Sequence, residues 1–139
     1  MLGVKTYERD YIDSCRAQME DMLARYAAVV DAAGGARSRA ALAELEPKLL
    51  NQLVVALDAS FVHRIRAIEG KDGNPLNAVR MLAASILQHG AVLTLDKTIK
   101  YKLERSVLGI AAGEPIALDP ARFAKVLDAF IAEIGARFT

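Results

Sequence analysis

From Thr6 to Ala33 the chain reads TYERDYIDSCRAQMEDMLARYAAVVDAA, and the spacing of its apolar residues predicts one long helix. Apolar or mildly apolar side chains recur at alternating intervals of three and four residues, at Ile12, Cys15, Met19, Met22, Tyr26, Val29 and Ala33. This heptad stripe is typical of a helix that packs along its whole length. Thr6 is the expected N-cap, and Gly34–Gly35 is expected to end the helix in a left-handed C-cap.

The length of this helix bears on the oligomeric state. A helix of these residues would span about 42 Å at 1.5 Å per residue. That is longer than a compact domain of 139 residues, so its end is expected to project or to pair with another chain. Val55 and Val62 form a second narrow apolar stripe on the next predicted helix, opposite its main face. Together the two features predict a homodimer.

Proline positions mark the other predicted helices. Pro47 is expected to begin a second long helix that runs to Ile68 or Glu69, after a short helical segment over residues 40–45. Asn74-Pro75 has the signature of an N-cap followed by the first helical residue, and this third helix is expected to end near His89. Asp119-Pro120 predicts the start of the last helix in the same way. Gly70 and Gly73 are expected to give the tight connection between the second and third helices its positive φ angles.

Residues 91–118, before the last helix, carry a mixed signal. Thr98, Ile99 and Tyr101 favour extended structure, whereas Gly113 and Pro115 favour a turn. The segment is expected to be irregular or to contain a β-hairpin. Residues 1–139 are therefore predicted to form a single, mainly α domain, a bundle of about four principal helices with this insertion before the last one.

Composition and motifs exclude several classes of protein. The net charge is +1, and 53% of the residues are hydrophobic. The chain lacks an apolar segment of membrane-spanning length, an N-terminal secretory pattern and a second cysteine to pair with Cys15, so we expect a cytoplasmic protein without a membrane partner. It also lacks the spacings His-Glu-x-x-His, Cys-x-x-Cys and Gly-x-x-x-x-Gly-Lys-Ser/Thr, so we expect no metal and no cofactor.

The charge is concentrated in the middle of the chain. Residues 63–105 carry eight basic and four acidic side chains, a surplus of four positive charges. Arg64 falls on the main apolar face of the predicted second helix, where a buried guanidinium is costly unless it is paired. Three explanations stay open: the side chain reaches solvent at the helix end, binds an anion, or meets an internal carboxylate, with the candidates Glu20, Asp31 and Asp72.

The leading functional hypothesis is a non-enzymatic helical module that binds a second copy of itself or a small anionic ligand. The basic and amide side chains around the start of the third helix would hold such an anion, because free N–H groups at a helix N-terminus attract negative charge. The candidate ligand-binding residues are Arg64, Arg66, Lys71, Asn74, Asn77 and Arg80, with Lys97 and Lys100 folding over them.

Two alternatives belong to other functional classes. An acid–base enzyme would use His63 or His89 with Glu69 or Asp72, because histidine titrates near neutral pH. A nucleic-acid-binding protein would use residues 97–105, KTIKYKLER, where four basic side chains flank Tyr101. One tyrosine and a net charge of +1 make nucleic acid the less favoured partner.

Overall fold

The computed structural model describes residues 3–139, and within this range the chain is mainly helical with no β-strand. Four helices are long, as predicted, and together with two short ones they are α1 (Arg9–Ala32), α2 (Ala36–Ser60), α3 (Arg66–Glu69), α4 (Pro75–Gln88), the 3-10 helix η1 (Leu103–Arg105) and α5 (Pro120–Arg137). The predicted mainly α bundle is confirmed.

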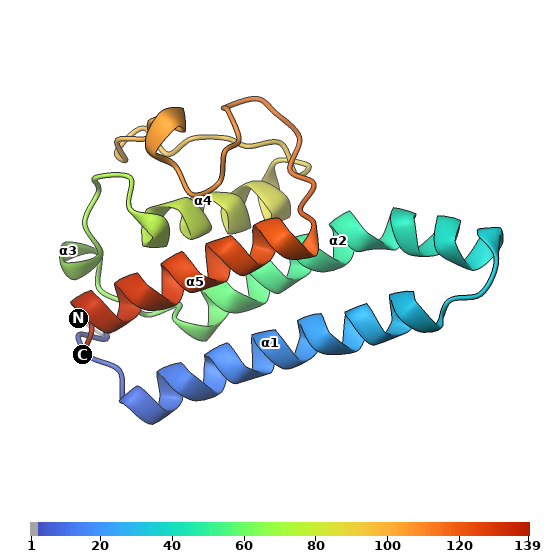
Figure 1. Ribbon diagram of the computed structural model, residues 1–139. Helices are drawn as coiled ribbons and strands as arrows, with labels where there is room; N and C mark the ends of the chain where they lie inside the picture. The colour runs from blue at the N-terminus through green and yellow to red at the C-terminus, as the bar shows by residue number, and fades with distance from the viewer. Residues whose placement is uncertain (1–2) are drawn as a thin grey trace.

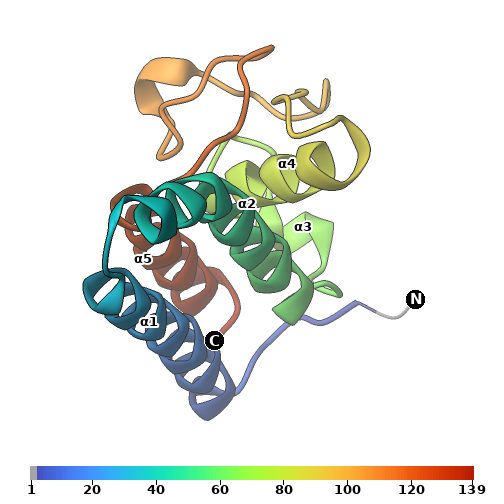
Figure 2. The same cartoon turned by 90° about the vertical axis from the view of Figure 1, so that its right-hand side faces the viewer.

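The long helices are stacked in layers. α2 packs against α1, α4 and α5, and α5 also contacts α1 and α4. Figure 1 shows α1 on one side of the α2–α5 pair and α4 on the other, with the insertion covering α4. Figure 2 looks from the end at which α1 and α2 are joined, and from there the same order of layers is visible. The core lies between these layers and includes Leu57, Phe61, Leu82, Phe123 and Phe130.

The heptad stripe of α1 is buried along only part of its length. Ile12, Cys15, Met19 and Tyr26 are buried, whereas Met22 and Val29 are 42% and 53% exposed. α5 accounts for the difference, because Asp128, in its third turn, pairs with Arg16, well before the end of α1. The end of α1 and the first turns of α2 therefore project past the start of α5, as Figure 1 shows.

Both predicted caps of α1 are wrong, although the helix ends within one residue of the predicted Ala33. The helix begins at Arg9 after Glu8, which makes no side-chain capping bond. Thr6 belongs to an extended segment, because the Val4 N–H binds the carbonyl of His63 and the Tyr7 N–H binds that of Phe138, each over 2.7 Å. At the other end, the C-cap Ala33 is extended, and the positive φ of Gly35 serves the start of α2 instead.

The predicted break at Pro47 is also wrong. α2 is continuous from Ala36 to Ser60 with Pro47 inside it. Proline removes one N–H from the helix and leaves the carbonyl four residues earlier without its partner. That residue, Ala43, lies on an exposed part of α2, where water can bind the carbonyl.

α2 ends at Ser60, eight residues before the predicted Ile68. Residues distant in the sequence bind the backbone groups at this end of the helix. The Tyr11 hydroxyl donates to the carbonyl of Ser60 over 2.5 Å, and Val4 forms a parallel bridge with Arg64. Arg64 and Val62 therefore lie outside the helix, so the predicted placement of Arg64 on its apolar face and the second stripe of Val55 and Val62 are both wrong. Val62 is instead 56% exposed in a turn.

The starts of α4 and α5 agree with the sequence. The Asn74 side chain accepts hydrogen bonds from the N–H groups of Leu76 and Asn77, and Asp119 accepts one from Arg122. Gly73, before α4, has a φ of +86°, and a Cβ placed on it would lie 2.1 Å from the carbonyl oxygen of Lys100. The predicted positive φ is confirmed, and Gly73 also allows the insertion to approach this turn.

The insertion over residues 91–118 is irregular, one of the two predicted forms. An isolated antiparallel bridge joins Val92 to Pro115, and η1 is its one helical turn. Its buried apolar side chains pack into the core and hold it on the helices; they are Leu93, Ile99, Leu108, Ile110, Ile116 and Leu118.

Candidate functional site

The centre of the 63–80 region is the carboxylate of Glu69, which is completely buried. Arg64 Nε donates to its Oε1 over 2.7 Å, and Arg80 Nη2 donates to the same oxygen over 2.6 Å. Asn77 Nδ2 and Arg80 Nε donate to Oε2 over 2.8 and 3.0 Å. The anion that these basic and amide groups hold in the structure is thus a side chain of the protein itself.

Arg64 meets internal carboxylates, which was one of the three explanations left open by the sequence. Its guanidinium is fully buried, so it does not reach solvent. Besides Glu69, it pairs with Asp58 over 2.9 Å and donates to the carbonyls of Phe61 and Leu76. The proposed partners Glu20, Asp31 and Asp72 are wrong, because the end of α2 turns Arg64 toward α3 and α4 instead.

The same cluster ties together segments that are distant in the sequence. The carbonyl of Glu69 accepts hydrogen bonds from Asn74 Nδ2 over 2.8 Å and from Arg137 Nη1, at the end of α5, over 3.0 Å. Arg137 also lies 3.5 Å from the carboxylate of Asp72. We call Glu69 and the side chains that bind it or its carbonyl the Glu69 cluster. This cluster joins the end of α2, the short helix α3, the loop before α4, α4 itself and the end of α5.

The surroundings of Glu69 and Asp72 keep both carboxylates ionised. Burial alone would raise the pKa of Glu69, but hydrogen bonds and charges from Arg80, Arg64 and Asn77 outweigh it and lower this pKa below its ordinary value. A hydrogen bond from Asn74, assisted by the charge of Arg137, likewise lowers the pKa of Asp72.

The predicted anion-binding residues separate into three groups. Arg64, Asn74, Asn77 and Arg80 are engaged in the Glu69 cluster. The side chains of Lys71, Lys97 and Lys100 are exposed, and the contact between their loops is a backbone hydrogen bond from Lys100 to the carbonyl of Lys71.

Arg66 stands apart from both groups. Its Nη2 is 3.9 Å from Asp96, and its Nε is shielded from solvent without a hydrogen-bond partner in the described part of the chain. A cavity of about 260 Å³ lies beside it, and His63 and Arg80 also line this cavity. It is a small basic recess on the outer side of the Glu69 cluster.

The four predicted acid–base residues do not form a pair. His63 and His89 are exposed, and over residues 3–139 no hydrogen bond or ion pair joins either of them to Glu69 or Asp72. Glu69 has no exposed oxygen with which to exchange a proton with a substrate. The arrangement is that of a structural ion cluster rather than of a general base.

In the 97–105 segment the basic side chains are exposed, whereas the side chain of Tyr101 is fixed by a hydrogen bond. Lys97, Lys100, Lys102 and Arg105 are exposed. Tyr101 is half-buried, and its hydroxyl donates to the carbonyl of Ile110. Its ring is therefore held against the insertion instead of being presented for stacking on a base.

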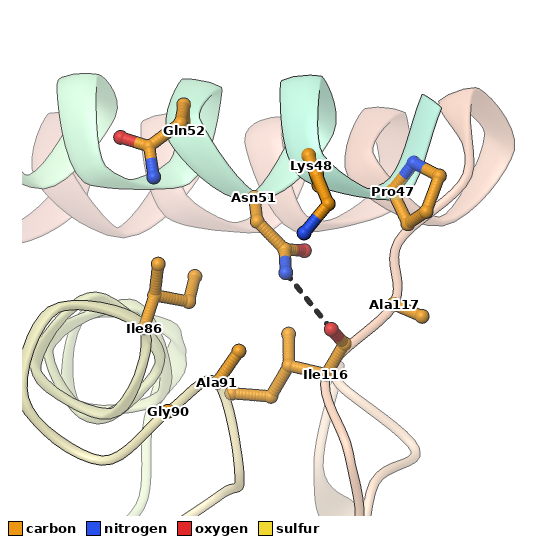
Figure 3. Close-up of a pocket in the computed structure, with 9 residues that line it drawn as sticks. All are labelled: Pro47, Lys48, Asn51, Gln52, Ile86, Gly90, Ala91, Ile116 and Ala117. Carbon is orange, nitrogen blue, oxygen red and sulfur yellow. Dashed lines mark hydrogen bonds between the residues drawn. The ribbon is translucent and has the colours of Figure 1, made fainter. Parts of the chain in front are cut away.

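A cavity of about 510 Å³ lies between α2, the end of α4 and the insertion (Figure 3). The buried Asn51 side chain forms its inner wall by donating to the carbonyl of Ile116 and accepting from the N–H of Leu118. Lys48 and Gln52 line its rim, and no histidine, cysteine or carboxylate does. Asn51 was not among the predicted site residues; the signal for it in the sequence is an amide between Leu50 and Leu53 on a helix face that is otherwise apolar.

An apolar groove of about 490 Å³ runs between the projecting ends of α1 and α2. Val29, Ala32 and Ala33 line it from α1, and Ser38, Ala41 and Leu42 line it from α2. Large apolar side chains are exposed on this part of the molecule, namely Met22, Val29, Val30 and Leu45. We call this region, residues 21–45, the hairpin tip.

Other features of residues 3–139 give no further indication of a site. No three histidine, cysteine, aspartate or glutamate side chains in this range lie close enough together to hold a metal ion. No helix in it combines the length and apolar character needed to cross a membrane. No family model, curated protein or solved structure matches the chain. Function is therefore inferred from the geometry of this chain alone.

We expect Glu69→Gln to lower the free energy of unfolding by roughly 3–5 kcal/mol, because it leaves Arg64 and Arg80 without their shared counter-charge in a buried site. Urea denaturation followed by circular dichroism measures this change. Glu20→Gln is the matched control, since Glu20 pairs with Arg16 over 3.4 Å at the exposed surface and should contribute less than about 0.5 kcal/mol. Equal effects of the two substitutions would contradict the structural role of Glu69.

The pH dependence of stability should report the same cluster. Because the pKa of Glu69 is lower in the folded than in the unfolded protein, its contribution is complete above the ordinary glutamate pKa of about 4.3 and is lost as the pH falls through the folded value. Between pH 7 and pH 3 the stability of the wild type should therefore fall more steeply than that of Glu69→Gln. Parallel curves for the two proteins would show that Glu69 titrates normally.

Proposed function

We propose that this protein is a helical binding module that works by self-association through the hairpin tip. The observation that carries the proposal is the apolar groove between the projecting ends of α1 and α2. Within the body, α5 packs on both α1 and α2. α5 begins at Pro120 and does not reach the hairpin tip, so the apolar side chains of α1 and α2 in the tip are exposed to solvent.

A second copy of the chain suits this groove. Two helical hairpins that each expose an apolar face can cover one another as a four-helix bundle, the usual way in which such faces are buried. The hairpin tip carries three basic and three acidic side chains, so two copies do not repel each other through net charge. Exposed valine, methionine and leucine side chains would supply the hydrophobic free energy of association.

Leu45→Asp should weaken self-association by roughly tenfold or more, because each dimer would bury two carboxylates in the apolar contact. Leu45 is 48% exposed in the isolated chain, so the substitution should leave the monomer folded. Sedimentation equilibrium over a range of protein concentrations measures the dissociation constant.

Leu87→Asp is the matched control for Leu45→Asp. Leu87 is also a leucine on a helix and is 63% exposed, but it lies on α4, away from the hairpin tip. It should leave the dissociation constant unchanged. A wild-type protein that stays monomeric at about 100 μM, far above a typical specific dissociation constant, would overturn the proposed function.

Binding of a small oxyanion beside Arg66 is a second candidate function. The observation that favours it is the Arg66 Nε, a buried donor that lacks an acceptor within residues 3–139. A buried N–H without a partner costs about 1–3 kcal/mol, which an oxyanion in the adjoining recess would recover. His63 and Arg80 line the same recess and can contribute further donors.

Isothermal titration with inorganic phosphate tests this second candidate. The wild type should bind phosphate, and Arg66→Met should abolish the binding because it removes the unpaired donor and its charge. Arg105→Met is the control, since Arg105 is an exposed arginine in η1. Absence of binding to the wild type, or equal loss in both variants, would exclude a specific site at Arg66.

A further inference from the structure

The hairpin tip carries charged side chains that have no partner within the described residues. Arg37, Arg39 and Glu44, on the first turns of α2, are exposed and make no ion pair over residues 3–139. Within the same tip, Arg25 on α1 does pair with Asp21 over 2.9 Å. Arg37, Arg39 and Glu44 thus border the apolar groove between α1 and α2.

The positions of these charges on α2 follow a simple order. Arg37 and Glu44 are seven residues apart, which places them on one flank of the helix, two turns from each other. Arg39 and Glu46 have the same spacing on the opposite flank, and Glu46 faces α1, because its carboxylate accepts a hydrogen bond from the Tyr26 hydroxyl over 3.0 Å. Ser38, Ala41 and Leu42, which line the groove, lie between the two flanks. On both flanks the positive residue comes first.

This order specifies how a second copy can pack. In an antiparallel pair of α2 helices, the Arg37–Glu44 flank meets the same flank of the partner in reverse order, so the positive end of one lies beside the negative end of the other. In a parallel pair, the Arg37 flank would meet the Arg39 flank at the same height, positive against positive and negative against negative. The charges therefore favour the antiparallel arrangement and oppose the parallel one.

We propose that two copies associate through antiparallel pairing of the first turns of α2, in which Arg37 of each subunit pairs with Glu44 of the partner subunit. This inference rests on the proposed function and adds the orientation and register of the contact. The two-fold axis passes at the height of Ala41, about midway between the paired charges. Its small side chain, which lines the groove, allows the two helix backbones to approach closely at that point, and each α2 lies against the apolar groove of the other subunit.

Charge reversal tests the register. Arg37→Glu and Glu44→Arg should each weaken self-association about tenfold, because each replaces two attractive pairs by two repulsive ones in the symmetric dimer. The double variant Arg37→Glu/Glu44→Arg restores both pairs with their signs exchanged and should return to the wild-type dissociation constant. Sedimentation equilibrium at about 50 mM salt, where surface charges are weakly screened, measures all four proteins.

Mixing the two single variants gives the sharpest measurement. A subunit with two glutamates at these positions complements a subunit with two arginines, so native mass spectrometry of the mixture should show mainly heterodimers. Arg105→Glu and Glu104→Arg, which change the same charges in η1, should dimerise like the wild type and show no heterodimer preference.

The outcomes separate this register from the proposed function itself. A wild-type dimer whose affinity is unchanged by Arg37→Glu and by Glu44→Arg would overturn the register and leave self-association standing. Self-association that is weakened by both single variants but not restored by the double variant would also overturn it. A wild-type protein that is monomeric throughout would overturn the proposed function, and the register with it.

Discussion

The carboxylate of Glu69 is the group on which the rest of the structure depends. It is buried on a helix of four residues, and it is held there by two arginines and an asparagine from other segments. A lone buried carboxylate would be unfavourable by several kcal/mol, so these donors and their segments must be in place together. The end of α2, the turn before α4 and the end of α5 meet at this point because of that requirement.

This requirement also changes how the basic character of the middle segment is understood. A local surplus of positive charge suggests attraction for an external anion, but Arg64 and Arg80 are largely neutralised by Glu69 and Asp58 inside the fold. Arg66 differs from them, because its solvent-shielded Nε has no acceptor within residues 3–139 and lies beside an open recess. The anion binding that we propose at this end of the molecule therefore involves Arg66 rather than the start of α4.

The opposite end of the molecule follows a different constraint. α5 is shorter than α1 and α2, so it cannot cover the apolar faces of both along their whole length. The uncovered part is a hairpin whose exposed side chains include Met22, Val29 and Leu45, with charged residues along its flanks. Self-association, the function we propose, would use this surface, whereas the Glu69 cluster holds together the segments of the fold that presents it.

The sequence by itself determined the features that depend on local chemistry. The heptad stripe of α1, the N-caps Asn74 and Asp119 and the positive φ of Gly73 could all be predicted, since each depends on side chains within a few residues. Tertiary structure alone decided the end of α2, the pairing of Arg64 and the role of Asn51. No proline or glycine ends α2 after Phe61; Tyr11 and Val4, about 50 and about 60 residues earlier in the chain, bind the groups there. Interactions between distant segments leave no periodic signal in the sequence, and only the folded chain brings their partners together.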